Sequence, residues 1–250
     1  MAGSDEQMPS FEVSHEGEAS DTLLVGLAET GMAGLTAAQY VVEHLGFERR
    51  GHVSTDELPS ITPFEGGVPR HHTRLFSRDD VDLTVLTGEL LVPLWVARSF
   101  SDSVLEWTRE NDVREIVFMS GVALPHRPDE HAVYYVATED YRESRLVDSG
   151  VPPMAGGFLE GVSAELVQRG IDSPLSVGVF VTPVHPVAQD VEAAVRLLEG
   201  FDDVYGFGVD RAPLEDYAEH VNDYYTQLAE RIDEERDGIA GRVAEDRMFI

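Results

Sequence analysis

A short apolar run, followed by a glycine-bearing turn and an amphipathic segment, constrains the fold of this chain most strongly. Leu23 to Leu27 is an apolar run of strand length, which is typical of a strand buried on both faces. Thr30 stands where a helix N-cap is expected, and the apolar residues after it recur at helical spacing until Gly46. Glycines in such a turn let the helix pack close to the sheet, and three are present: Gly26, Gly31 and Gly34. The sequence therefore predicts a strand–turn–helix unit.

The glycines of this turn do not have the spacing of a phosphate-binding loop. No lysine followed by serine or threonine comes after the last glycine, and the spacing differs from G-x-G-x-x-G. Nucleotide binding is therefore disfavoured. Whether a small ligand binds near Gly31 and Gly34, or near Asp56 and Glu57, stays open.

The rest of the chain alternates between segments with strand and helix patterns. Strands are predicted at 49–60 (with a loop), 72–76, 81–86, 115–119, 132–137 and 175–181, and helices at 94–111, 139–148, 160–170 and 186–198. This alternation predicts an α/β fold with a mostly parallel sheet covered by helices on both faces. An apolar stripe from Leu214 to Ile232 predicts one more, long C-terminal helix.

The sequence predicts one folded domain with an extension at each end. Residues 1–20 carry acidic side chains without a basic one, which is typical of a mobile arm. Residues 21–236 form the predicted α/β domain. Residues 237–250 follow a fully charged stretch and contain Gly238 and Gly241, so we expect a flexible C-terminal tail.

The composition is strongly acidic and free of cysteine. Asp and Glu number 47 against 18 basic residues, all of them arginine, and the formal net charge is −29. This balance argues against nucleic acid as a partner, because backbone binding needs basic patches. Without cysteine there are no disulfides and no thiolate chemistry. No run is long enough to span a bilayer and no secretory signal is evident, so we expect a cytoplasmic protein that does not bind membranes.

Four motifs carry a family resemblance. The turn at residues 28–34 is glycine-rich but lacks a proline–glycine pair, and residues 56–60 read D-E-L-P-S where D-E-L-P-P would be the full motif. Residues 81–89 look like a second core strand, and residues 156–163 read G-G-F-L-E-G-V-S, similar to G-G-I-x-G-I-S. In this order and spacing, the motifs resemble the proteasome-assembly-chaperone family over about residues 22–232.

The resemblance implies both a fold and a function. The implied fold is a three-layer α/β/α sandwich, similar in outline to nucleoside phosphorylases. The implied function is non-enzymatic: a homo-oligomeric chaperone that assists assembly of the 20S proteasome by binding its α-type subunits, without a cofactor or a metal. The acidic, lysine-free composition also resembles that of proteins from salt-accumulating haloarchaea, where molar salt screens charge to a Debye length of about 3 Å.

The last three residues resemble a docking signature. Met248, Phe249 and Ile250 match the hydrophobic-tyrosine-any ending of proteasome activators, with phenylalanine in place of tyrosine. A tail of this kind presents an aromatic ring and a terminal carboxylate to a pocket between subunits, which the resemblance places in the proteasome α-ring. The simpler alternative is an apolar ending without this role.

Several histidines and one serine are candidates for an enzyme active site, so an enzymatic function stays open. His126, His131 and His185 follow predicted strands, and with Asp56 or Glu57 they could form a metal or acid–base site, although no ligand-spacing motif supports it. The adjacent residues His71 and His72 would point to opposite faces of a strand. Ser120 follows a strand but lacks the G-x-S-x-G context of a nucleophile. The alternative function is therefore a small-molecule enzyme, either a hydrolase or a nucleoside-processing enzyme, on the same fold.

Overall fold

The computed structural model describes residues 10–55, 60–124, 127, 130–185 and 189–221. The chain divides into two units, residues 1–210 and residues 211–250. In the second unit, residues 212–221 are helical. The predicted stripe from Leu214 to Ile232 begins in this helix, and the rest of the stripe lies outside the described residues, as does the predicted tail.

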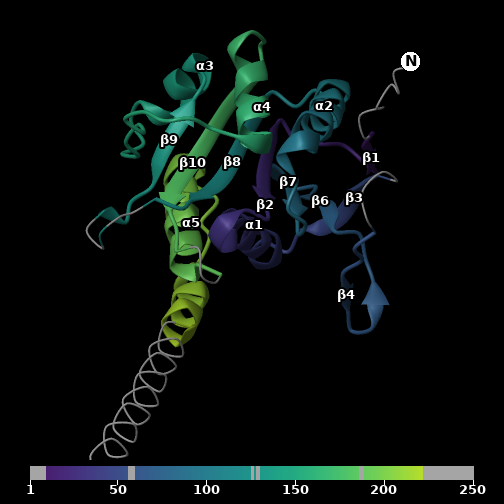
Figure 1. Ribbon diagram of the computed structural model, residues 1–250, viewed down its shortest axis with the longest axis horizontal. Coiled ribbons are helices and arrows are strands. Elements are labelled where there is room, and N and C mark those ends of the chain that lie inside the picture. Colours follow the sequence, from purple (N-terminus) through teal and green to yellow (C-terminus); the bar gives the residue numbers. More distant parts are fainter. Residues whose placement is uncertain (1–9, 56–59, 125–126, 128–129, 186–188, 222–250) are drawn as a thin grey trace, which may run out of the picture. The chain divides into compact units, whose positions relative to one another are not determined.

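The first unit is built around an eight-stranded mixed sheet (Figure 1). Its strands are β1 (Glu12–His15), β2 (Thr22–Leu27), β3 (Glu48–Ser54), β6 (Thr73–Arg78), β7 (Val81–Gly88), β8 (Glu115–Val122), β9 (Tyr134–Ala137) and β10 (Ser176–Pro183), in the order β1-β3-β6-β7-β2-β8-β10-β9. A small hairpin, β4 (Phe64–Glu65) with β5 (Val68–Pro69), forms a separate two-stranded sheet.

Parallel pairing is confined to the centre of the sheet. Strands β7, β2, β8 and β10 run parallel, whereas β6, β3 and β1 on one side and β9 on the other pair antiparallel. The α/β class is confirmed, and the predicted parallel sheet is its central half. The pair of β6 and β7 is antiparallel because its two-residue connection, Asp79-Asp80, can only reverse the chain.

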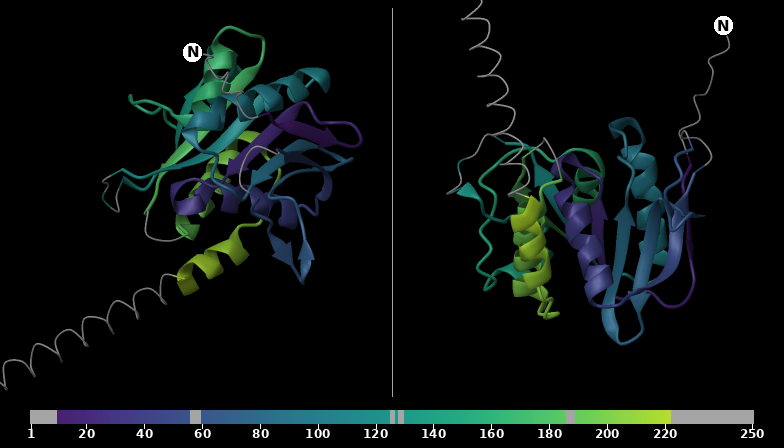
Figure 2. Two further views of the ribbon diagram at one scale, coloured as in Figure 1. Left: turned by 45° about the vertical axis from the view of Figure 1, so that its right-hand side comes forward. Right: turned by 90° about the horizontal axis from the view of Figure 1, so that it is seen from below.

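Helices cover both faces of this sheet (Figure 2). They are α1 (Ala33–His44), α2 (Leu94–Glu110), α3 (Glu139–Tyr141), α4 (Gly161–Ile171) and α5 (Val191–Tyr205), with a 3-10 turn at Thr30–Met32 and a π-helical turn at Arg142–Leu146. Helices α1 and α5 pack against each other, and α2 packs against α4. One hydrophobic cluster joins the α2 and α4 side to alternate residues of the central strands, among them Leu23, Val25 and Leu27 of β2. Every residue of β2 is buried, as predicted for a strand covered on both faces.

The glycine-bearing turn does bring α1 close to the sheet. A Cβ atom at Gly34 would lie 2.7 Å from the carbonyl carbon of Met119 in β8 and still closer to its oxygen. The expectation that Thr30 caps the helix is wrong, because a 3-10 turn intervenes and α1 begins at Ala33. Gly31 and Met32 both have positive φ angles, of 72° and 53°, so the chain reverses within the turn and the Thr30 side chain makes no capping bond.

Part of the predicted N-terminal arm belongs to the sheet. Residues 12–15 form β1, which pairs with β3 at the sheet edge. Phe11 beside it meets Phe100 of α2 edge to face, with ring centroids 5.4 Å apart, and Val13 packs against the same hydrophobic cluster. This apolar contact outweighs the acidic composition from which a mobile segment was predicted. The prediction of a mobile arm is therefore wrong for residues 12–15, and residues 1–9 lie outside the described residues.

Candidate functional site

A crevice opens at the carboxyl ends of the central parallel strands. It has a volume of about 450 Å³ and is lined by residues that follow β2, β7 and β8 and by the start of α4. The chain leaves β2 into α1 on one face and leaves β7 into α2 on the other, so the crevice lies at a topological switch point of the sheet. Open α/β sheets bind ligands preferentially at such points.

Glu29 and Ser120 form the polar centre of this crevice. The hydroxyl of Ser120 donates to Oε2 of Glu29 at 2.7 Å, and the backbone N–H of Gly121 donates to the same carboxyl group. Glu29 is partly exposed as a residue, but its carboxyl group is largely buried. Burial raises the pKa of Glu29 to about 7, against the lowering effect of the two hydrogen bonds. This carboxyl group is therefore poised to change its charge near neutral pH.

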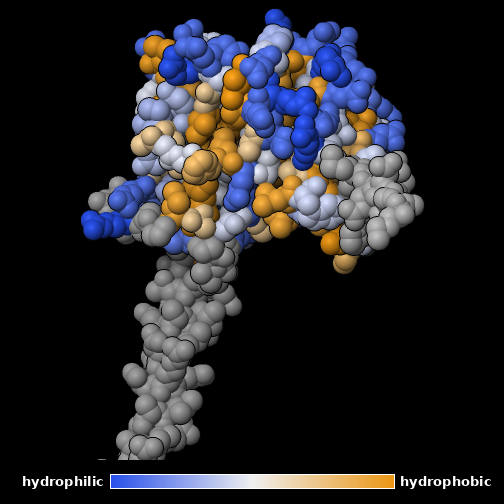
Figure 3. All heavy atoms as spheres, turned by 45° about the horizontal axis from the view of Figure 1, so that its top comes forward, coloured by the Kyte–Doolittle hydropathy of each residue, from blue (hydrophilic) through white to orange (hydrophobic). Residues whose placement is uncertain are grey.

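Exposed apolar side chains surround the crevice. Leu91, Leu94 and Phe158 line it and remain 68%, 64% and fully exposed, and Leu124 adds a fourth exposed apolar residue. Trp95, next to Leu94 in α2, is 64% exposed. We call the four exposed residues that line the crevice, together with their neighbour Trp95, the apolar rim. Figure 3 shows one face of the molecule, on which hydrophobic residues form patches between hydrophilic ones. Single exposed hydrophobic residues are common on proteins, but a group around one opening is typical of an interaction site.

Two of the motifs that suggested a family meet at this crevice. The glycine-bearing turn supplies Ala28, Glu29 and Thr30, and the G-G-F-L-E-G-V-S segment supplies residues 158–163. The strand motif at residues 81–89 contains β7, which ends beside them. Of the D-E-L-P-S motif, only Ser60 lies within the described residues, and it lines a second cavity of about 420 Å³ with His71 and His72. Motifs far apart in sequence thus converge on one place.

A match to a family model shows which protein family this chain belongs to. The model of the PAC2 family matches residues 23–229. The chain belongs to the PAC2 family. No match was found among curated proteins.

Solved structures share the fold of this PAC2 family member. PbaA of Pyrococcus furiosus, described as an archaeal homologue of proteasome-assembly chaperone, superimposes with a TM-score of 0.82 at 16% identity, covering 96% of this chain and 100% of that one. PbaB of the same organism, described as an archaeal proteasome activator, gives a TM-score of 0.77 at 19% identity, covering 89% and 100%. A Mycobacterium tuberculosis proteasome-assembly chaperone homologue gives 0.60 at 16% identity, covering 82% and 94%. The family resemblance inferred from the motifs is confirmed.

The histidine candidates come together only in part. The rings of His131 and His185 lie 5.5 Å apart between centroids. His185 contacts Asp190, with Nδ1 and Oδ2 3.0 Å apart, and Asp190 also accepts from the backbone N–H groups of His185 and Ala193 as the N-cap of α5. Burial alone would raise the pKa of Asp190, but these hydrogen bonds lower it. Asp190 is therefore occupied in capping a helix.

No metal centre is formed by the described part of the chain. Within it, no group of three or more histidine, aspartate or glutamate side chains is arranged to hold an ion. His126, Asp56 and Glu57 lie outside the described residues, so their combination with His131 and His185 stays a prediction. His71 stacks on His52 with centroids 3.6 Å apart, while Nδ1 of His72 lies 2.8 Å from Oγ1 of Thr73. These two neighbours make separate contacts, but both precede β6 and line the second cavity, so the prediction that they point to opposite faces of a strand is not confirmed. Nor is any described helix long and apolar enough to cross a membrane.

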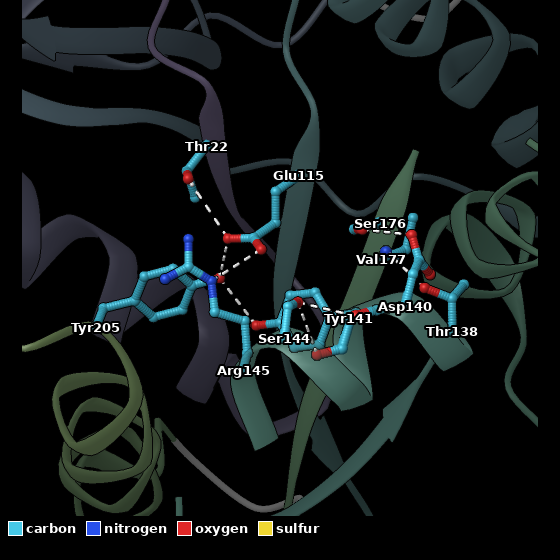
Figure 4. Close-up of polar contacts among 10 residues, drawn as sticks. All are labelled: Thr22, Glu115, Thr138, Asp140, Tyr141, Ser144, Arg145, Ser176, Val177 and Tyr205. Carbon is cyan, nitrogen blue, oxygen red and sulfur yellow. Dashed lines mark hydrogen bonds and ion pairs between the residues drawn. The ribbon is translucent and has the colours of Figure 1, made fainter. Parts of the chain in front are cut away.

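A buried polar network lies at the opposite, amino ends of the strands (Figure 4). Oε1 of Glu115, at the start of β8, accepts from the Tyr205 hydroxyl at 2.8 Å, and Oε2 accepts from Nε of Arg145 at 3.0 Å. The hydroxyls of Tyr205 and Tyr141 are 2.9 Å apart, and the Arg145 guanidinium lies over the Tyr205 ring at 5.0 Å. Burial is the main reason that both tyrosine pKa values are raised. The network ties α5 and the π-helical turn to the sheet, so we assign it a structural role.

The sequence pointed to Ser120 and to the turn, but it did not single out Glu29 or the apolar rim. Glu29 carries no local signal, because its contact with Ser120 joins residues 91 positions apart. The rim residues come from three segments of the chain that lie far apart in sequence. The tail residues Met248, Phe249 and Ile250 lie outside the described residues and stay a prediction.

Proposed function

We propose that this chain is a non-enzymatic assembly factor of the 20S proteasome. It holds α-type subunits through the apolar rim while they associate, and its tail of Met248, Phe249 and Ile250 docks in a pocket of the α-ring. The observation that carries the proposal is the exposed apolar rim around the crevice where the family motifs meet. Membership of the PAC2 family and the shared fold with PbaA and PbaB support it.

The proposed tail chemistry is that of carboxylate capture. A methionine side chain, a phenylalanine ring and a terminal carboxylate give the tail two apolar groups and one charge for a pocket between subunits. Phenylalanine lacks the hydroxyl of the tyrosine in related signatures, which removes one hydrogen bond worth about 1 kcal/mol. The protein would work as a homo-oligomer in the cytoplasm. The net charge of −29 fits a cytoplasm of high salt concentration.

Co-purification with 20S α subunits at high salt tests this function. Deleting the last three residues should abolish capture of assembled α-rings, and Phe249→Tyr should strengthen it by about fivefold, the equivalent of one hydrogen bond. Val243→Ala, a small truncation in the same segment, is the matched control and should leave capture unchanged. Capture that survives the deletion would remove the tail from the mechanism.

A second arm separates the rim from the tail. Replacing Leu94 and Trp95 together by serine should weaken binding of free α subunits. Tyr217→Ser, an exposed aromatic residue of the second unit, serves as a control. If α subunits bind the rim variant and the tail deletion as well as they bind the wild type, the proposed function is wrong.

The alternative of a small-molecule enzyme is favoured by one observation. The pair of Glu29 and Ser120 lies in a crevice at the carboxyl ends of parallel strands, where substrates of many α/β enzymes bind. Thermal-shift screening with nucleosides and phosphates distinguishes the two functions, because a substrate that binds the folded protein raises its unfolding temperature. A stabilising compound that the protein also converts would replace the proposed function by this one.

A further inference from the structure

Among the residues that the structure describes, the lining of the crevice is acidic and includes no basic side chain. Its two ionisable side chains are those of Glu29 and Glu160, and the remaining described lining residues are apolar or carry hydroxyl groups. We propose that the crevice receives an arginine or lysine side chain from a protein partner, with Glu29 as its counter-ion. The inference rests on the proposed use of the rim for protein binding and adds the chemistry that the crevice recognises.

Within the described part of the chain, Glu29 differs from Glu115 and Glu89 in having no cationic partner. Glu115 pairs with Arg145 at 3.0 Å. Glu89 accepts from Arg70 at 2.5 Å and from Arg74 at 2.6 Å. Among the described residues, Glu29 instead has only neutral donors, the hydroxyl of Ser120 and the N–H of Gly121. A buried carboxylate without a cation is unfavourable when ionised, and a cation from outside would relieve this.

The shape of the crevice and its rim favours a basic side chain carried by a polypeptide. A volume of about 450 Å³ holds an arginine or lysine side chain. Both side chains have an apolar stem below a charged head, and the stem can lie against Leu91 and Leu94 while the head reaches Glu29. Trp95 and the fully exposed Phe158 extend the apolar surface beyond the opening. The occupant should therefore carry apolar residues next to its basic one.

Binding of a cation should be coupled to loss of a proton. The carboxyl group of Glu29 is half-protonated near pH 7, since its pKa is raised to about 7 by burial. Only the ionised form attracts a cation, so binding shifts this equilibrium and releases a proton. Between pH 6 and pH 8 the ionised fraction rises about tenfold, and the affinity should rise by a similar factor.

Titration calorimetry with two blocked tripeptides, at fixed high salt, tests the inference. The probe is acetyl-Leu-Arg-Leu-amide, and the control peptide replaces arginine by citrulline, which is neutral but of nearly equal shape. At pH 8 the arginine peptide should bind about tenfold more tightly, as expected for a largely desolvated charge pair. At pH 6 most of this preference should disappear. Equal binding of both peptides at pH 8, or no binding of either, would overturn the inference.

The variant Glu29→Gln separates this carboxylate from the overall negative charge. Glutamine keeps an oxygen to accept from Ser120 and Gly121, so the fold should persist, which a thermal unfolding scan checks. The preference for arginine and its pH dependence should both be lost. Glu43→Gln removes the same charge from an exposed position near the far end of α1 and should change neither. A preference that persists in Glu29→Gln would also refute the assignment.

The outcome of the peptide test can be separated from the outcome of the proteasome-binding test. If the peptides fail to discriminate while α subunits still bind through the rim, only the basic-side-chain inference falls. If the arginine peptide binds through Glu29 and α subunits do not bind, the crevice keeps its chemistry and the proposed function is wrong.

Discussion

The close approach of α1 to the sheet makes a sharp stability prediction for Gly34→Ala. The added Cβ would lie 2.7 Å from the carbonyl carbon of Met119 and closer still to its oxygen. Both atoms belong to the backbone of β8, a central strand paired on both sides, so they cannot turn away. Overpacking of this kind costs about 3 kcal/mol, and alanine regains up to about 1 kcal/mol of helix propensity. We expect a net loss of about 2 kcal/mol.

Thermal unfolding at fixed high salt measures this loss. For a chain of this size, 2 kcal/mol corresponds to a fall of about 4–8 °C in unfolding temperature. The matched control is Gly200→Ala in α5, where the new Cβ would lie 3.1 Å from Cγ1 of Val133, a side-chain atom that can shift. This variant should be as stable as the wild type or slightly more stable. If both variants unfold at the same temperature, the close-packing explanation of the glycine motif is wrong.

Two further predictions concern carboxyl groups. The pKa of Glu29 is raised from 4.5 to about 7 in the folded protein, so the folded state holds this proton more tightly than the unfolded state does. The stability of the wild type relative to Glu29→Gln should therefore fall by up to about 3 kcal/mol as the pH rises through this window. Urea unfolding measures this difference in stability, and a difference that stays the same between pH 5 and pH 8 would contradict the prediction. Glu115→Gln should destabilise the fold by about 1–3 kcal/mol because Arg145 loses its charged acceptor. In a double-mutant cycle with Tyr205→Phe, the loss in the double variant should differ from the sum of the two single losses by about 0.5 kcal/mol or more. Additive losses would show that the network is not one unit.

The order of most strands and helices along the chain was predictable from the sequence, because each of these elements carries its own pattern of apolar residues. Residues 23–27 and 116–119 are apolar runs that the central positions of the sheet bury on both faces, and the structure has β2 and β8 there. The start of α5 was predicted too early, at Pro186. Asp190 caps this helix by accepting from the N–H of Ala193, and an acidic residue directly before a helical pattern is a signal that the sequence did contain.

Features that depend on distant contacts were not predictable in this way. The segment around Phe11 resembles a solvated arm in composition, and it joins the sheet only because Phe100, 89 residues later, offers a ring to pack against. The same holds for the site. The turn that contains Glu29 was recognised from its glycines, but the burial of this carboxyl group follows from Ser120 and Gly121 on another strand. Long-range pairing decides such positions, and a single sequence does not encode it locally.

The energetics of Glu29 link stability to the proposed site. At neutral pH this residue weakens the fold, since burial disfavours its ionised form, whereas a glutamine could make the same two hydrogen bonds without that penalty. Residues that break a local rule of stability are expected where a protein functions. The apolar rim breaks a second such rule at the same opening, because Leu91, Leu94 and Phe158 leave hydrophobic surface in water. A partner that brings a cation and apolar neighbours would relieve both, which is why the two features are best explained together.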